Sequence, residues 1–132
     1  MTLRIVRLGT PRAPDEGLRL GTVRRPPRGV PKAEFASGNW YDVWYPNLAP
    51  SAELVKAALA AGTDAEWAAF AKAFRAEMAV PEAARSLELL AAFSHRTNFS
   101  LGCYCADETR CHRSILRALL AEKGAAMENS PG

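Results

Sequence analysis

Residues 98–120 constrain the fold of this chain more than any other stretch. Apolar and cysteine residues alternate with smaller or polar ones over 99–105, at the two-residue period of a β-strand, whereas isoleucine and leucine recur at the helical period over 115–120. A polar loop joins the two patterns. The stretch therefore predicts a strand, a tight loop and a helix. All three cysteines and one of the two histidines lie between Cys103 and Arg113, so the chemistry is concentrated at the junction.

The rest of the chain supplies the elements that would surround this unit. At 132 residues, it is long enough for one compact domain and too short for two ordinary ones. Short β-rich runs occur at 3–8 and 18–23, and helical periodicity with capping residues predicts helices over 51–61, 64–79, 82–95 and 111–122. We expect a single α/β domain over residues 1–132, with a small mixed or parallel sheet, about four helices packed around it and a flexible tail from residue 124.

The helix boundaries rest on residues that satisfy free backbone N–H groups. Ser51 is a good N-cap, Thr63 and Glu66 have the spacing of a capping box, and Pro81 suits a first helical position. For the last helix, Thr109 is the expected N-cap, which places residues 110–113 in its first turn.

The start of that last helix is a candidate anion site. Free N–H groups and the helix dipole favour an anion there, and Arg110 and Arg113 add positive charge. The same surroundings lower the pKa of a cysteine, so Cys111 is a candidate nucleophile. His112 is a second catalytic candidate, although neighbouring helical residues point about 100° apart and do not simply form a pair.

Two other interpretations of the cysteines remain open. Cys103, Cys105, Cys111 and His112 could supply up to four ligands to zinc, although their spacing is not a standard one. The simplest alternative is a set of buried cysteines beside a solvated, arginine-rich helix cap. Apart from the zinc interpretation, no cofactor is expected.

The N-terminal quarter of the chain is strongly basic. Residues 1–32 hold eight basic and two acidic residues, a net charge of +6, while residues 33–132 hold nine basic and twelve acidic, a net charge of −3. The proline-rich segment 24–38 predicts a long loop carrying Arg24, Arg25 and Arg28. We take these arginines as candidate contacts to a phosphate-bearing small molecule or a nucleic acid. The alternative is a solvated loop and a strand edge protected by charge.

An aromatic segment follows the basic loop. Trp40, Tyr41, Trp44 and Tyr45 occupy four of six consecutive positions. Aromatic rings beside cations could stack on nucleic-acid bases. Large aromatic side chains fill the cores of small domains far more often, so we expect a packing role for these four.

Features of membrane proteins and secreted proteins are weak in this sequence. No apolar run approaches the ~20 residues of a membrane span, and the opening residues MTLRIVRLGT have arginines where a signal peptide has its apolar core. We expect a cytoplasmic protein without a membrane partner. In such a reducing compartment, its three cysteines would be thiols rather than disulfides.

The segments WYDVWYPNLAPSAELVKAAL, FAKAFRAEM and CHRSIL resemble the domain of unknown function 488 family, whose short members are called YeaO-like. The resemblance runs from about Gly17 to Leu120, and its most specific element is the run 111–113 after a cysteine-bearing strand. It implies a small cytosolic α/β protein without an established activity, so whether the chain is an enzyme stays open. This chain has Cys105 where the family typically has an acidic residue, and VRRPPRG where the family has a segment like Asp-Arg-Leu-Trp-Pro-Arg-Gly.

Overall fold

A four-stranded parallel sheet forms the centre of the molecule. The computed structural model describes residues 1–128, and in it the strand order is β1-β4-β2-β3. The strands are β1 (Leu3–Arg7), β2 (Leu18–Gly21), β3 (Val43–Trp44) and β4 (Phe99–Cys103). Each pairs with its neighbours in parallel. The predicted α/β domain is confirmed, and its sheet is parallel rather than mixed.

The central strand is β4, which lies between β1 and β2 and is buried along its whole length. Phe99 and Leu101 pair with Leu3 and Ile5 of β1 and point into one apolar core, while Ser100 points to the opposite face. Burial on both faces is typical of a parallel sheet, which must be covered on each side. The end of β4 therefore lies inside the molecule, between the ends of its neighbours.

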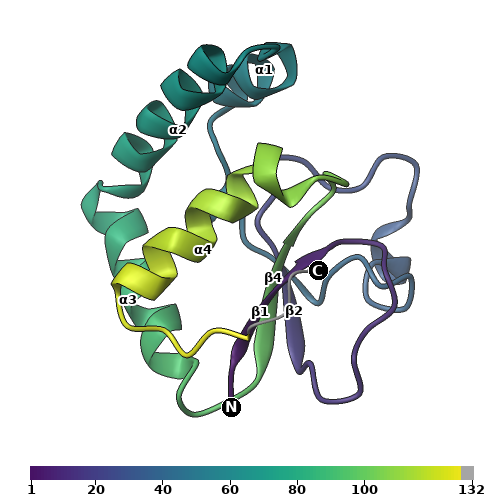
Figure 1. The fold of residues 1–132 in the computed structure, drawn as a ribbon. Helices are drawn as coiled ribbons and strands as arrows, with labels where there is room; N and C mark the ends of the chain where they lie inside the picture. The colour runs from purple at the N-terminus through teal and green to yellow at the C-terminus, as the bar shows by residue number, and fades with distance from the viewer. Residues whose placement is uncertain (129–132) are drawn as a thin grey trace.

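The helices lie on one side of this sheet, and the first of them packs on the second (Figure 1). They are α1 (Ala52–Ala60), α2 (Asp64–Met78), α3 (Pro81–Phe93) and α4 (His112–Glu122). Their bounds differ from the predicted ones by at most two residues at each end. The apolar stripe of α2 supplies Phe70, Phe74 and Met78 to the core, where they meet Leu87 of α3 and Leu116 of α4. This core fixes the position of α4 against the sheet.

Three of the predicted helix starts are confirmed. The Ser51 hydroxyl accepts from the Leu54 N–H at 3.3 Å, and that of Thr63 accepts from the Glu66 N–H at 3.1 Å. Pro81 occupies the first position of α3.

The predicted N-cap of α4 is wrong. The carboxylate of Asp107 accepts from the backbone N–H of Thr109 at 3.0 Å and holds that residue in a short 3₁₀ turn, Glu108–Arg110. Cys111 then adopts an extended conformation (φ −128°, ψ 149°) and is itself the N-cap. The helix therefore begins at His112, and Arg110 lies before it rather than in its first turn.

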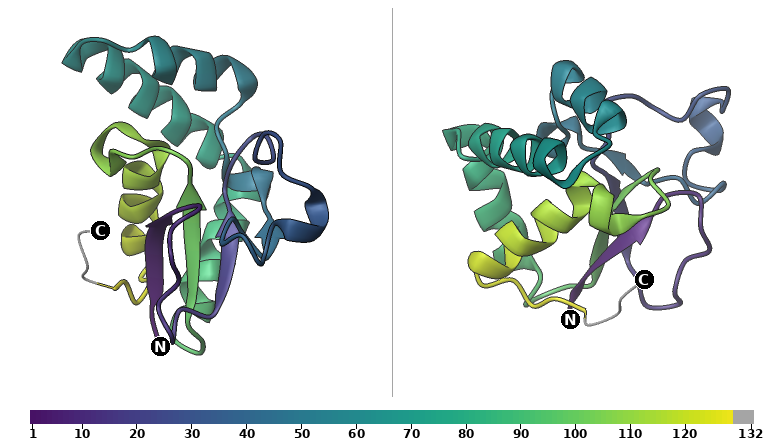
Figure 2. Two further views of the ribbon diagram at one scale, coloured as in Figure 1. Left: turned by 90° about the vertical axis from the view of Figure 1, so that its right-hand side faces the viewer. Right: turned by 45° about the horizontal axis from the view of Figure 1, so that its top comes forward.

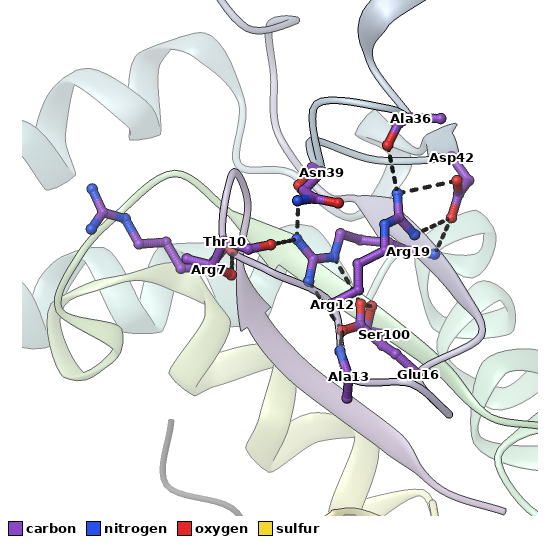
Figure 3. Close-up of polar contacts among 10 residues, drawn as sticks. All are labelled: Arg7, Thr10, Arg12, Ala13, Glu16, Arg19, Ala36, Asn39, Asp42 and Ser100. Atoms are coloured by element: carbon purple, nitrogen blue, oxygen red, sulfur yellow. Dashed lines mark hydrogen bonds and ion pairs between the residues drawn. The ribbon is translucent and has the colours of Figure 1, made fainter.

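The opposite face of the sheet is covered by the loops that follow β1 and β2 (Figure 2). Beneath them lies a buried ion pair, which Figure 3 shows in detail. Arg19 donates to Glu16 at 2.7 and 3.0 Å, and Ser100 donates to the same carboxylate at 2.7 Å. Arg19 also donates to the backbone carbonyls of Thr10 and Asn39 at 2.9 and 2.8 Å. We call this set the Glu16–Arg19 cluster.

Most of the basic residues in the N-terminal quarter form hydrogen bonds or ion pairs with other parts of the chain. Arg12 ion-pairs with Asp42 at 2.7 Å, and Arg4 with Asp15 at 3.0 Å. Five of the eight basic residues of segment 1–32 bind other parts of the chain in this way: Arg4, Arg7, Arg12, Arg19 and Arg24. The charge asymmetry of the sequence is therefore largely a structural feature of the loops rather than a free basic surface.

Most of the aromatic segment, residues 40–45, packs against the rest of the chain instead of forming a strand. Only residues 43–44 form a strand, and Tyr41 is 3% exposed. The indole N–H of Trp44 donates to the Val23 carbonyl at 2.8 Å, and the Tyr45 hydroxyl lies 2.8 Å from that of Ser86. The expected packing role is confirmed for Tyr41.

The chain returns to β1 after α4. Residues 126–128 run beside this strand, where the Leu3 N–H donates to the Ala126 carbonyl and the Glu128 N–H to the Leu3 carbonyl, both at 2.8 Å. The predicted flexible tail begins at residue 124, and its last part, 129–132, lies outside the described residues. Within residues 1–128, no helix has both the length and the apolar composition to cross a bilayer.

Candidate functional site

The three cysteines meet beyond the carboxyl end of β4, the edge at which open α/β sheets bind ligands. Figure 1 shows β4 leading into the loop that returns as α4. Cys103 ends the strand, Cys105 lies in the following turn and Cys111 caps the helix. All three are free thiols. We call them the thiol cluster.

The thiol cluster is tight and mostly shielded from solvent. The Sγ atoms of Cys103 and Cys105 are 3.9 Å apart. The sulfurs of Cys103 and Cys111 and a ring nitrogen of His112 all lie within 4.8 Å of one another. Cys103 is 6% exposed and Cys111 2%, because apolar side chains from the ends of β1 and β2 and Tyr41 pack around them, whereas Cys105 is half-buried. Solvent therefore reaches the cluster through Cys105.

His112 faces the thiols with a defined ring nitrogen. Its Nε2 lies 2.6 Å from the backbone carbonyl of Thr22, and the Thr22 hydroxyl in turn donates to the Gly102 carbonyl at 3.0 Å. Since a carbonyl only accepts, Nε2 carries a hydrogen. Nδ1 is then the nitrogen that lies 3.8 Å from the Cys111 sulfur. The 100° angle expected between neighbouring helical residues does not apply to this pair, because Cys111 is an extended N-cap rather than a residue on the helix.

The three thiols have different acidities. Hydrogen bonds from Cys103 and Cys111 and the charge of Arg113 hold the pKa of Cys105 well below its usual range. Hydrogen bonding to Cys103 and contact with His112 also lower the pKa of Cys111. Hydrogen bonds to Cys105 and Cys111, together with burial, raise the pKa of Cys103. Cys105 is thus the thiol with a lowered pKa that solvent can reach, whereas the predicted nucleophile, Cys111, is enclosed.

Arg113 is a buried cation beside the cluster. It is 4% exposed, and one of its terminal nitrogens donates to the Cys105 carbonyl at 2.6 Å. Its Nε–H has no hydrogen-bond partner among residues 1–128. The N-terminus of α4 is also buried, and no side chain of the described residues caps it. Two kinds of N–H donor are therefore buried here without an acceptor atom among the described residues. They are the free backbone N–H groups at the start of α4 and the Nε–H of Arg113.

The other predicted anion-binding arginines fall into two groups. Arg110 turns away from the cluster, forming an ion pair with Asp64 and lying 5.8 Å from the ring centre of Trp67. Arg24 donates to the carbonyls of Pro46, Ala49 and Pro50 between 3.0 and 3.3 Å.

Arg25 and Arg28 are exposed on the loop after β2. The Tyr104 hydroxyl donates to the Arg25 carbonyl at 2.8 Å, which brings this loop next to the turn between Cys103 and Cys105. The structure thus brings Arg25 toward the site and leaves Arg24 and Arg110 engaged elsewhere.

A cavity of about 310 Å³ lies apart from the thiols. Arg24 lines it together with residues of the segment before α1 and of the α2–α3 junction: Asn47, Ala49, Ser51, Glu77, Met78, Val80, Glu82 and Ala83. Because Arg24 is already bonded to three carbonyls, it offers little to an anion there.

Sequence reasoning missed two residues of the site. Thr22 holds the His112 ring, and Tyr41 packs beside Cys103 and Cys111 with a hydroxyl that has no partner within residues 1–128. Thr22 could have been found from its place near the end of the predicted β-rich run 18–23, since the ends of parallel strands meet at one edge. Tyr41 carried no such signal, because its position depends on how the loop after β2 folds back.

Similarity to known proteins extends over nearly the whole of this structure. Neither any curated protein nor any solved structure matches the chain significantly. One family model matches residues 3–124, from the first residue of β1 to the turn after α4, and is described as the active DUF488-N3 subclade. The match includes every residue of the thiol cluster, together with His112 and Arg113. The chain therefore belongs to the DUF488-N3a family, within the domain of unknown function 488 proteins.

Proposed function

We propose that the chain binds a phosphate-bearing ligand, a nucleotide or a nucleic acid, at the start of α4. The observation that supports this proposal is that two neighbouring groups of N–H donors are buried without acceptors in the described part of the chain. The helix begins inside the molecule without a side-chain cap, and the Nε–H of Arg113 lacks a partner within residues 1–128. Phosphate oxygens suit both groups, because a helix N-terminus and a guanidinium each bind anions through N–H donors.

The charge balance supports an anion at this position. Among the described residues, Arg113 forms no ion pair, although it is 4% exposed. A buried charge without a counter-charge is costly, and a bound anion would offset that cost. Arg25 and Arg28 lie on the neighbouring loop and could contact the rest of a longer ligand. The part of the ligand that enters the site would meet the Cys105 sulfur.

Inorganic phosphate and a nucleoside monophosphate test the proposal directly. At low salt, each should raise the melting temperature of the reduced protein, and a concentration near 100 Kd adds about 2.7 kcal/mol of stability. Arg113→Met should abolish the shift. Arg75→Met is the matched control, since it removes the same charge from a surface ion pair with Glu122. A wild-type protein whose melting temperature ignores both ligands at low salt would sink the proposal.

A metal ion is the second candidate, favoured by a different observation. Three possible ligand atoms, from Cys103, Cys111 and His112, lie within 4.8 Å of one another. The hydrogen bond from His112 Nε2 to a backbone carbonyl is the support that metal-binding histidines usually have. Zinc fits this sulfur and nitrogen set best, and Cys105 is close enough to Cys103 to complete it. When bound, zinc would act as a structural ion or as a Lewis acid.

Cobalt titration tests the metal site independently of phosphate. Cobalt(II) bound by thiolates in tetrahedral geometry gives intense visible absorption. We expect this absorption to saturate at one equivalent of cobalt per chain. His112→Gln should weaken this binding by about 10- to 100-fold or more, as loss of a metal ligand or its support does. His95→Gln is the control, because the ring of His95 instead bonds to the Gly124 carbonyl. If His112→Gln binds cobalt as tightly as the wild type does, the site is not built as proposed.

A further inference from the structure

All the cysteines of the chain meet in the thiol cluster, yet neither an anion site nor a zinc site explains why one of them is open to solvent. Cys105 is half-buried, whereas Cys103 and Cys111 are 6% and 2% exposed. An accessible thiol with a second thiol behind it is the arrangement of redox-active cysteines, in which the first reacts and the second resolves the product.

We propose that Cys105 and Cys103 form a two-electron redox couple that reduces hydroperoxides and closes an intramolecular disulfide. The two sulfurs are already 3.9 Å apart. A disulfide needs a separation of about 2.05 Å, so a modest side-chain rotation would bring them together. Cys105 lies two residues beyond the last residue of β4 and therefore outside the strand.

The reaction balances with the groups present and one external oxidant. The Cys105 thiolate attacks the terminal oxygen of a hydroperoxide, forming an S–O bond and breaking the O–O bond. The leaving alkoxide takes the proton of the Cys103 thiol, giving an alcohol, a Cys105 sulfenic acid and a Cys103 thiolate. The Cys103 thiolate then attacks the Cys105 sulfur, forming the disulfide and releasing hydroxide. A dithiol reductant restores both thiols by two successive exchanges.

Cys103 is a better resolving residue than Cys111. The Cys111 sulfur lies 3.8 Å from Nδ1 of His112, and its residue is fixed as the extended N-cap of α4. Arg113 donates to the Cys105 carbonyl and so holds a positive charge near the reacting sulfur. This activity goes beyond the proposed ligand binding, since it needs neither phosphate nor metal.

Peptide mapping after peroxide treatment tests the proposal on the intact chain. The reduced protein, in phosphate-free buffer with a chelator, receives a small excess of hydrogen peroxide, followed by alkylation and trypsin. Cleavage after Arg96, Arg110 and Arg113 leaves Cys103 and Cys105 together in peptide 97–110 and Cys111 alone in peptide 111–113. We expect peptide 97–110 to be lighter by two hydrogen atoms and unalkylated, and peptide 111–113 to be alkylated.

Single substitutions assign the two roles. Cys105→Ser should slow thiol oxidation by about tenfold or more, since buried thiols react poorly. Cys103→Ser should stop at a Cys105 sulfenic acid that dimedone traps, whereas Cys111→Ser should still close the disulfide, but more slowly, because it removes a hydrogen bond to the Cys105 sulfur. A cross-link between peptides 97–110 and 111–113 would overturn the assignment of Cys103. Three unreacted thiols, or a sulfinic acid without a disulfide, would overturn the activity itself, and the wild-type map alone decides this. Phosphate-induced melting shifts, measured separately, would be unaffected by either result.

Discussion

Two buried polar sites within residues 1–128 border the same central strand but differ in how completely their hydrogen bonds are made. In the Glu16–Arg19 cluster, the guanidinium of Arg19 meets a carboxylate and two backbone carbonyls, and Ser100 of β4 binds the same carboxylate (Figure 3). At the end of β4, Arg113 has one acceptor and an Nε–H without a partner among the described residues.

This difference is the one that we expect between a structural site and a ligand-binding site. A polar network that satisfies itself stabilises the fold and leaves nothing for a ligand to bind. A buried site with donors left over stores unfavourable energy that a ligand can relieve, and proteins keep such sites where function needs them. The comparison predicts that substitutions in the first site reduce stability, and that substitutions in the second reduce binding or reactivity instead.

The largest effect is expected from Glu16→Gln. The change leaves the fully buried Arg19 without its counter-charge, which costs about 3–5 kcal/mol in comparable buried pairs. Urea unfolding of the variant and the wild type measures this directly. The control is the double variant Glu16→Leu with Arg19→Met, which removes both charges and should recover most of the loss. A single-variant loss below about 1 kcal/mol would mean that the pair contributes little to the fold.

The same cluster makes stability sensitive to acid. Burial alone would raise the pKa of Glu16, but the hydrogen bonds from Arg19 and Ser100 and the charge of Arg19 outweigh it and lower that pKa from 4.5. A carboxyl whose pKa is lower in the folded state adds stability above its unfolded pKa and loses it as the pH falls through the folded value. Wild-type stability should therefore fall more steeply below pH ~4.5 than that of Glu16→Gln. Parallel pH profiles would contradict the role given to Glu16.

The sequence predicted the strand, loop and helix around the thiol cluster because those patterns are local. Alternation over 99–105 and the leucine periodicity over 115–120 depend on neighbouring residues only. The Glu16–Arg19 cluster was not predicted, since its parts come from four separate segments and Ser100 lies 84 positions from Glu16. The ion pairs of the basic N-terminal quarter could not be predicted for the same reason: a sequence counts charges but does not show that Arg12 meets Asp42, 30 positions away.

The start of α4 shows a subtler limit. Thr109 is a good N-cap residue, but the Asp107 carboxylate accepts from its backbone N–H, and the helix start lies at Cys111 instead. That shift of two residues decides the chemistry, because it turns the Cys111 sulfur toward His112 and puts Arg110 outside the site. Composition alone could indicate that the site is rich in thiols and cations. The roles of individual residues depend on backbone angles that the pattern does not set.

The third prediction concerns Arg113 at the buried start of α4. Arg113→Met removes a buried charge that has no ion-pair partner among the described residues, so the free energy of unfolding should change by less than about 1 kcal/mol. The same variant should lose the phosphate response completely. Unfolding in urea with and without phosphate gives both values in one experiment. A loss of stability as large as that of Glu16→Gln would show that the two sites do not differ as proposed.

The smallest effect is expected from Arg110→Met, which tests whether phosphate binds only at the start of α4. Arg110 ion-pairs with an exposed carboxylate on α2 and lies over the Trp67 ring, and exposed pairs of this kind contribute only about 0–1 kcal/mol. Because its side chain points away from the thiol cluster, its removal should change the phosphate-induced melting shift little at moderate salt.

The decisive comparison is with Arg113→Met, three positions along the chain, which removes the same charge. Equal losses of the shift in both variants would mean that phosphate binds to a diffuse basic surface. A loss confined to Arg113→Met would place the anion at the buried start of α4, where the missing acceptors are.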